Sequence, residues 1–149
     1  MAPKKNYHYV QCGLPNVWLL NGYSITRNPY GEFVSIDDVD GLHKAIAEAL
    51  VGKPTPLTGM EFRFLRRELD MSQKRLGEIL GRDRQSIALC EKKEEVGEPY
   101  NFLLRHVYQE HLDRNAMYVE LVDRLNELDR LEYDGLRFAA DEDGWHKAS

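Results

Sequence analysis

Three helix starts, each close behind the end of the helix before it, constrain this chain more than any other feature. Thr58 and Glu61 have the spacing of a capping box, in which each side chain binds a free backbone amide of the helix start. Ser72 and Asp83 are residue types that cap helices, and Gly81 between them is typical of a helix end. The spacing predicts three short helices with tight turns between residues 57 and 98.

Each predicted helix carries apolar residues on one face, as packing against a core requires. The expected core positions are Phe62, Leu65, Leu69, Leu76, Ile79, Leu80, Ile87 and Cys90. The thiol of Cys90 is expected to act there as a small apolar group rather than as a redox sensor. The third helix leaves five residues on its other sides: Arg84, Gln85, Ala88, Leu89 and Lys92.

Residues 1–56 predict a small α/β module ahead of these helices. Asn21-Gly22 is a hairpin-turn dipeptide and favours pairing of residues 17–20 with residues 23–26, and residues 33–36 have the composition of a third strand. Asp37-Asp38 has the character of a helix start. The expected apolar face of that helix is Leu42, Ile46, Ala49 and Leu50. Residues 52–56, rich in glycine and proline, predict the end of the helix and a domain boundary.

After the predicted three-helix segment the chain is expected to stay helical and then to end in an acidic tail. One apolar set, Phe102, Leu103, Val107 and Tyr108, completes a domain of residues 57–112. A second set in residues 113–149 is Tyr118, Leu121, Val122, Leu125 and Leu128. Its spacing fits either a helix that closes the domain or one that pairs with its copy in a dimer. Beyond residue 135 we expect a partly mobile segment anchored by Phe138 and Trp145, and an α+β fold, mainly α, for the whole chain.

Composition excludes several classes of protein. With 149 residues, 42% of them apolar and 30% charged, the chain has the balance of an ordinary soluble domain. No apolar run approaches the length of a membrane span, so we expect a cytoplasmic protein without a membrane partner. Cys12 and Cys90 lie too far apart for a C-x-x-C metal motif, and the histidines are scattered. We therefore expect no metal, no other cofactor and no catalytic residues.

Charge is distributed unevenly along the chain. The whole chain has a net charge of −5, but residues 63–93 contain nine basic and five acidic residues, a local net charge of +4. Residues 109–149 contain five basic and eleven acidic residues, a local net charge of −6. A basic centre favours an anionic partner, and the acidic tail indicates either a second binding surface or only a solvated face.

One continuous stretch carries a recognisable pattern, with a Ser-Gln helix start, an apolar pair, a glycine and a second helix. It is LRRELDMSQKRLGEILGRDRQSIALCEKK, residues 65–93. Its key positions are Ser72, Gln73, Leu76, Leu80, Gly81, Ile87 and Glu91. The stretch resembles the Cro/repressor-type (XRE) helix-turn-helix family. The resemblance implies that Arg66 and Glu91 form a structural pair that ties the first helix to the third.

The chemistry of the third helix supports DNA reading. Arg pairs in two-pronged fashion with guanine, Gln pairs so with adenine, and an apolar side chain meets the methyl group of thymine. The expected base contacts are therefore Arg84, Gln85 and Leu89, although Leu89 departs from the polar residue often found there and packing against a neighbour is its alternative role. The expected phosphate contacts are Ser72, Gln73, Arg82, Lys92 and Lys93.

These observations predict a sequence-specific regulator of transcription, a repressor that binds double-stranded DNA at an inverted repeat as a homodimer. In such a dimer the two reading helices lie roughly 34 Å apart. The N-terminal segment also resembles MqsA-like (YgiT-type) antitoxins, which place a zinc-binding β module before the helix-turn-helix. Of the four cysteines that their module needs only Cys12 remains. The alternative function is therefore an antitoxin without zinc, which neutralises a toxin protein and represses its own operon. Two other interpretations of the N-terminal segment stay open: an unrelated module that packs on the helix-turn-helix, or a module that senses a small molecule.

Overall fold

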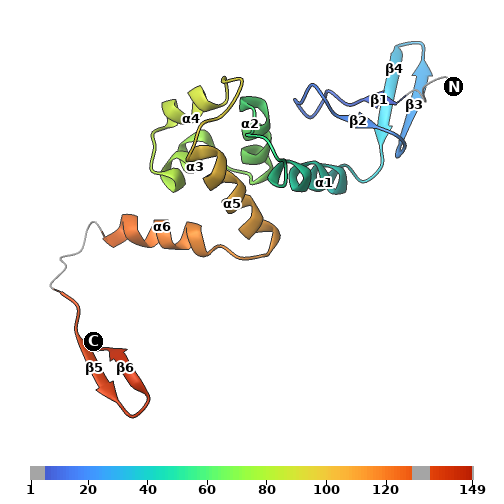
Figure 1. Ribbon diagram of the computed structural model, residues 1–149. Coiled ribbons are helices and arrows are strands. Elements are labelled where there is room, and N and C mark those ends of the chain that lie inside the picture. The colour runs from blue at the N-terminus through green and yellow to red at the C-terminus, as the bar shows by residue number, and fades with distance from the viewer. Residues whose placement is uncertain (1–5, 129–134, 149) are drawn as a thin grey trace.

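The computed structural model describes residues 6–128 and 135–148. Within these residues the chain is α+β, with six helices and three two-stranded antiparallel sheets (Figure 1). The strands are β1 Tyr7–His8, β2 Trp18–Leu19, β3 Tyr23–Asn28, β4 Gly31–Ile36, β5 Phe138–Asp141 and β6 Gly144–Lys147. The helices are α1 Val39–Val51, α2 Gly59–Glu68, α3 Gln73–Leu80, α4 Arg84–Cys90, α5 Tyr100–Leu112 and α6 Met117–Leu128. None of the helices in the described residues combines the length and the apolar character that crossing a membrane requires.

The N-terminal strands pair differently from the sequence prediction. The hairpin expected around Asn21-Gly22 is wrong, because β2 pairs with β1 and β3 pairs with β4. The tight turn lies at residues 29–30, where the side chain of Asn28 accepts a hydrogen bond from the amide of Tyr30 at 2.8 Å. That turn closes a ladder of six residue pairs, from Asn28 opposite Gly31 to Tyr23 opposite Ile36. The predicted pairing of residues 17–20 with residues 23–26 is a shorter ladder.

The predicted helix starts are confirmed. The hydroxyl of Thr58 accepts from the amide of Glu61, and the carboxylate of Glu61 accepts from the amide of Thr58, so the capping box is complete. Ser72 and Asp83 cap α3 and α4 in the same way, through the amides three residues on. Gly81 adopts the left-handed conformation, with φ of 71°, that ends α3.

The core lies among the helices. Its most completely buried side chains include Phe62, Leu65, Leu76, Ile79, Ile87, Val96 and Leu104. Helix α1 shares this core, because Ala47 and Leu50 are buried against it. The prediction of Ala49 on the apolar face is wrong, since Ala49 is exposed and Ala47 takes the inward position. Phe102 is likewise exposed, whereas Leu104 is buried in α5.

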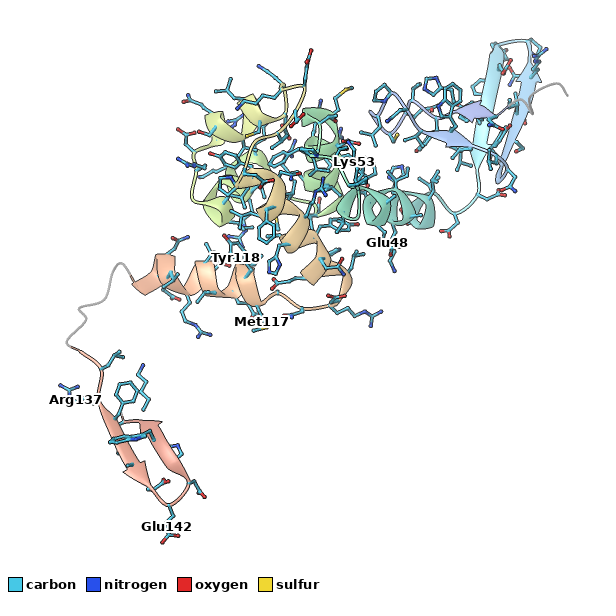
Figure 2. All side chains as sticks on the ribbon, in the orientation of Figure 1. Glu48, Lys53, Met117, Tyr118, Arg137 and Glu142 are labelled. Carbon is cyan, nitrogen blue, oxygen red and sulfur yellow. The ribbon has the colours of Figure 1, made fainter. Side chains whose placement is uncertain are left out.

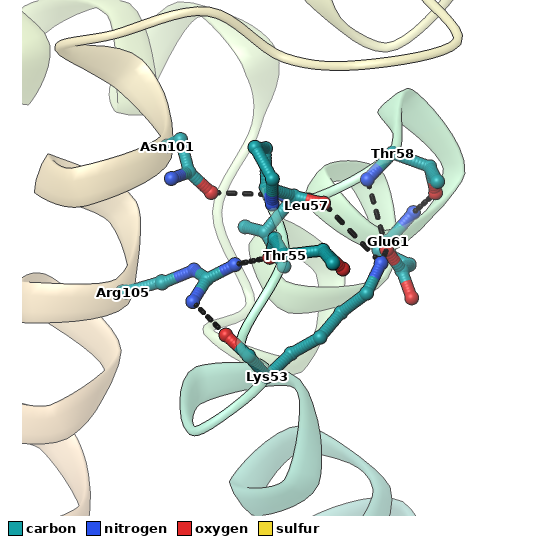
Figure 3. Close-up of polar contacts among 8 residues, drawn as sticks. Lys53, Thr55, Leu57, Thr58, Glu61, Asn101 and Arg105 are labelled. Carbon is teal, nitrogen blue, oxygen red and sulfur yellow. Dashed lines mark hydrogen bonds and ion pairs between the residues drawn. The ribbon is translucent and has the colours of Figure 1, made fainter.

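The segment between α1 and α2 is held against α5. The guanidinium of Arg105 donates hydrogen bonds to the carbonyl oxygens of Lys53 and Thr55, at 2.6 and 2.5 Å (Figure 3). The amide of Leu57 donates to the side chain of Asn101 at 2.9 Å, and Lys53 donates to the buried Glu61 at 2.6 Å. Side chains from α5 therefore fix how α1 meets the helices that follow.

Helix α6 and the C-terminal hairpin follow the core. Arg75 of α3 holds α6 through two hydrogen bonds to Asp123, at 2.8 and 2.9 Å. The strands β5 and β6 form a hairpin at the end of the chain, shown with the other side chains in Figure 2. Phe138 and Trp145 are both exposed there, so the prediction that they anchor this segment is wrong among the described residues. The side chain of Leu128 lies outside the part that the structure describes.

Candidate nucleic-acid interface

Helix α4 is held by its inward side and leaves the other side exposed. Ile87 and Cys90 are buried, and burial raises the pKa of the Cys90 thiol, so that it stays uncharged as an apolar core group. Arg84 and Gln85 are exposed in the first turn. Leu89 is 61% exposed one turn later, which places it outside the core. Three side chains of different chemistry therefore share one open side of a short helix.

The turn that presents α4 depends on close backbone approach. The amide of Arg82 donates to the carbonyl oxygen of Gly77 at 2.8 Å. A Cβ atom on Gly77 would lie 2.5 Å from the carbonyl oxygen of Arg82, which is closer than real Cβ contacts. Glycine at residue 77 therefore lets the chain fold back tightly from α3 into α4.

An ion pair joins α2 to the end of α4. Arg66 Nε lies 2.6 Å from Glu91 Oε1, and the two side chains are 12% and 6% exposed. Gln73 of α3 donates to the other carboxylate oxygen of Glu91, also at 2.6 Å. A second nitrogen of Arg66 donates to the carbonyl of Met71 at 2.8 Å. These contacts lock three helices together, and they leave the backbone of Gln73, not its side chain, for the expected phosphate contact.

Basic side chains border the exposed side of α4. Arg82 precedes α4 and lies over the ring of Tyr100, with 5.6 Å from its guanidinium carbon to the ring centroid. Lys92 and Lys93 are exposed directly after α4. A groove of about 380 Å³ lies between these groups, lined by Ser86, Leu89, Cys90, Lys92, Lys93 and Tyr100. The arrangement offers positive charge beside an apolar contact.

Two carboxylates near this surface, those of Glu91 and Asp83, form hydrogen bonds within the protein. The carboxylate of Glu91 is bound by Arg66 and Gln73, as described above. Hydrogen bonds from the side chain and amide of Ser86, together with Arg82 nearby, hold the pKa of Asp83 below its usual value. Glu94 and Glu95 are exposed in the loop after the lysines. The positive charge that this surface presents therefore comes from Arg82, Arg84, Lys92 and Lys93.

The remaining predicted phosphate residue, Ser72, serves first as a helix cap, because its hydroxyl accepts from the amide of Arg75 at 3.0 Å. Arg75 itself points to Asp123, and their hydrogen bond raises the pKa of Arg75 and lowers that of Asp123. Arg75 is therefore not a free cation on this surface.

Sequence reasoning missed two features. The first is Tyr100, which follows a proline and has no periodic signal that could have placed it beside Arg82. The second is a chain of polar contacts from the N-terminal module to α2. The hydroxyl of Tyr9 lies 2.7 Å from His43 Nε2, and His43 Nδ1 lies 3.0 Å from the carboxylate of Glu68. The helical spacing of His43 with Ala47 and Leu50 was the one available sign that this histidine faces inward.

Two other side chains of the N-terminal module make local contacts. His8 stacks on Trp18 and contacts the carbonyl of Pro15, whereas the thiol of Cys12 bonds to the carbonyl of Tyr9. In residues 6–128 and 135–148 no group of three His, Cys, Asp or Glu side chains has the arrangement of a metal site. No family model, curated protein or solved structure matches this chain.

Proposed function

We propose that this protein is a sequence-specific DNA-binding regulator of transcription, a repressor, in which α3 and α4 form a Cro-like helix-turn-helix. Helix α4 enters the major groove, which is wide enough for a helix and displays a distinct pattern for each base pair. The observation that carries the proposal is the open side of α4, where Arg84, Gln85 and Leu89 lie together on a helix fixed by buried residues.

Each exposed residue of α4 has a chemical role in this proposal. Arg84 donates to guanine, Gln85 pairs with adenine, and Leu89 contacts the methyl group of thymine. Arg82, Lys92 and Lys93 contact phosphates and fix the register of the helix on the duplex. The backbone amides at Ser72 and Gln73 add a phosphate contact at the start of α3. The ring of Tyr100 packs against the guanidinium of Arg82 and helps to hold it in place.

The rigidity of the site favours reading over loose attachment. The Arg66, Gln73 and Glu91 network and the tight turn at Gly77 hold α4 at a set angle to α2 and α3. Base readout needs such fixed geometry, because bidentate hydrogen bonds tolerate little displacement. A homodimer that binds an inverted repeat presents one such helix to each half-site.

The proposal is tested by binding to a fluorescent fragment of the DNA upstream of its own gene, beside a scrambled fragment of equal length. We expect preference for the native fragment and its loss in the Arg84→Ala, Gln85→Ala double variant. Lys44→Ala, an exposed basic residue on α1, is the control and is expected to bind as the unaltered protein does. Equal binding of both fragments that ignores the double substitution contradicts the proposal.

A second candidate, an antitoxin, is favoured by one observation on the N-terminal module. Trp18, Leu20, Tyr30 and Phe33 of this module expose large apolar surfaces. Its strands lie away from α4 (Figure 1). Exposed apolar groups gathered on a small module are typical of protein-binding surfaces. Under this alternative the module binds a toxin, and DNA binding represses the shared operon. Copurification with a small basic protein from the adjacent reading frame tests it, and the absence of any such partner when both frames are expressed together contradicts it.

A further inference from the structure

Helix α6 carries an exposed apolar strip outside the proposed DNA surface, and the ring of His106 in α5, which contacts the rings of both Phe102 and Tyr118, connects this strip to the exposed Phe102. Phe102 of α5 and Met117, Leu121 and Leu125 of α6 are each more than half exposed. The three residues of α6 recur every four positions, so they line one side of the helix. The strip borders a groove of about 420 Å³, lined by His106, Glu110, Met117, Tyr118, Glu120, Leu121 and Arg124.

The strip belongs to a helix that is firmly placed. Asp123 binds Arg75 of α3 through two hydrogen bonds, and Glu110 of α5 accepts from the amide of Tyr118 at 2.9 Å. Tyr118 and Val119 pack against the core. Figure 2 shows Met117 and Tyr118 at the end of α6 that adjoins α5. The inward side of α6 is thus already used, and the apolar strip remains free beside it.

The charged residues beside the strip, Glu120 and Arg124, are complementary to the same two residues in a second copy of α6. Glu120 and Arg124 lie four residues apart on α6 and line the same groove. Neither forms an ion pair with a described residue. If two copies of α6 run antiparallel about a twofold axis level with residue 122, Glu120 of each copy faces Arg124 of the other. Closed dimers are built in this way, because every contact at a twofold axis occurs twice.

We infer that this strip, with its Glu120 and Arg124 flank, binds a second copy of the same chain. Phe102, Met117, Leu121 and Leu125 leave water at the contact, and the two charged pairs fix the antiparallel direction. Helix α4 lies on the other side of the helical group from α6 and stays uncovered (Figure 1). The strip is the dimer surface that the proposed regulator needs, so this inference rests on the proposed function. Self-association is measured without DNA, and its failure is therefore distinguishable from a failure of DNA binding.

Analytical ultracentrifugation of the full chain over a range of concentrations tests the inference. We expect a reversible dimer, and a loss of association of at least tenfold in the Leu121→Glu, Leu125→Glu variant. Leu20→Glu, which changes an exposed leucine in the N-terminal module, is the control and should not change association. Both leucines of α6 are half exposed, so the variant keeps its fold, and circular dichroism verifies this.

Charge-reversal variants distinguish this specific pairing from non-specific hydrophobic association. Glu120→Arg and Arg124→Glu are each expected to weaken self-association, since each brings like charges together. An equimolar mixture of the two variants is expected to form a mixed dimer as tight as the unaltered one, because opposite charges then face each other at both places. A monomer at all concentrations, unchanged association in the leucine variant, or a mixture no tighter than its parts overturns the inference.

Discussion

The Arg66 guanidinium and the Glu91 carboxylate meet at 2.6 Å and connect α2 to the residue that follows α4. Both side chains are nearly buried, so each charge depends on the other for compensation. Removal of one partner leaves a buried charge, and we expect Arg66→Ala to lower the free energy of unfolding by roughly 3 kcal/mol. Urea unfolding measures this change.

An exposed ion pair, Arg27 with Glu32, is the matched control for the Arg66–Glu91 pair. Arg27 and Glu32 pair at 3.2 Å with side chains that are 82% and 52% exposed. Arg27→Ala should cost less than about 1 kcal/mol, because water replaces the lost partner. Equal costs for the two arginines would show that the Arg66 pair does not hold the helices together.

Gly77 sets the fold-back between α3 and α4. Gly77→Ala would bring a Cβ atom to 2.5 Å from a backbone oxygen, and backbone cannot turn aside as a flexible side chain can. We expect a loss of about 1 to 3 kcal/mol in unfolding free energy. Gly97→Ala, at a position with open space around it and no positive φ, should change stability little. A tolerated alanine at residue 77 would contradict the close approach described here.

Asp83 predicts a pH dependence. Its pKa is lowered in the folded protein by hydrogen bonds from Ser86, so its contribution to stability is present above its ordinary value of 3.8. That contribution is lost as the pH falls from 3.8 through the lower folded value. Asp83→Asn keeps an oxygen that caps α4 but cannot titrate. Urea midpoints between pH 7 and pH 2.5 should fall less in the variant, and parallel curves for both proteins would refute the assignment.

The local helix signals in the sequence transferred well to the structure. Among the long-range contacts, the Arg66–Glu91 pair implied by the family resemblance is present, but the others described here were not predicted. Capping by Thr58, Ser72 and Asp83 depends on residues three positions on, so spacing alone sufficed to predict it. The predicted hairpin at Asn21-Gly22 was wrong because residues 23–28 pair instead with residues 31–36, in a ladder that closes at Asn28.

The contacts missed from the sequence join residues far apart in the chain. Tyr9 meets His43, and Arg82 meets Tyr100, only after the helices have packed. No periodic pattern records such a meeting. The positions of the exposed residues on α4 followed from helical spacing, but the engagement of the Gln73 side chain with Glu91 did not.

The Arg82→Ala variant distinguishes a phosphate contact from a base contact. If it contacts a phosphate, Arg82→Ala should weaken binding to all sequences alike and lower the salt dependence, the slope of log K against log salt, by about one. Fluorescence anisotropy at four salt concentrations measures the slope. Tyr100→Phe retains the ring under the guanidinium and serves as the control. A loss that varies with DNA sequence would instead make Arg82 a reading residue.

The central claim is that α4 reads bases, and Gln85 tests it most directly. Binding of the unaltered protein and of Gln85→Ala is measured on the native site and on a set of sites that each carry one changed base pair. If Gln85 reads a base, the variant is expected to lose discrimination of about 1 to 3 kcal/mol at one base position and to keep it elsewhere. An identical pattern of base preference in the two proteins would contradict the claim.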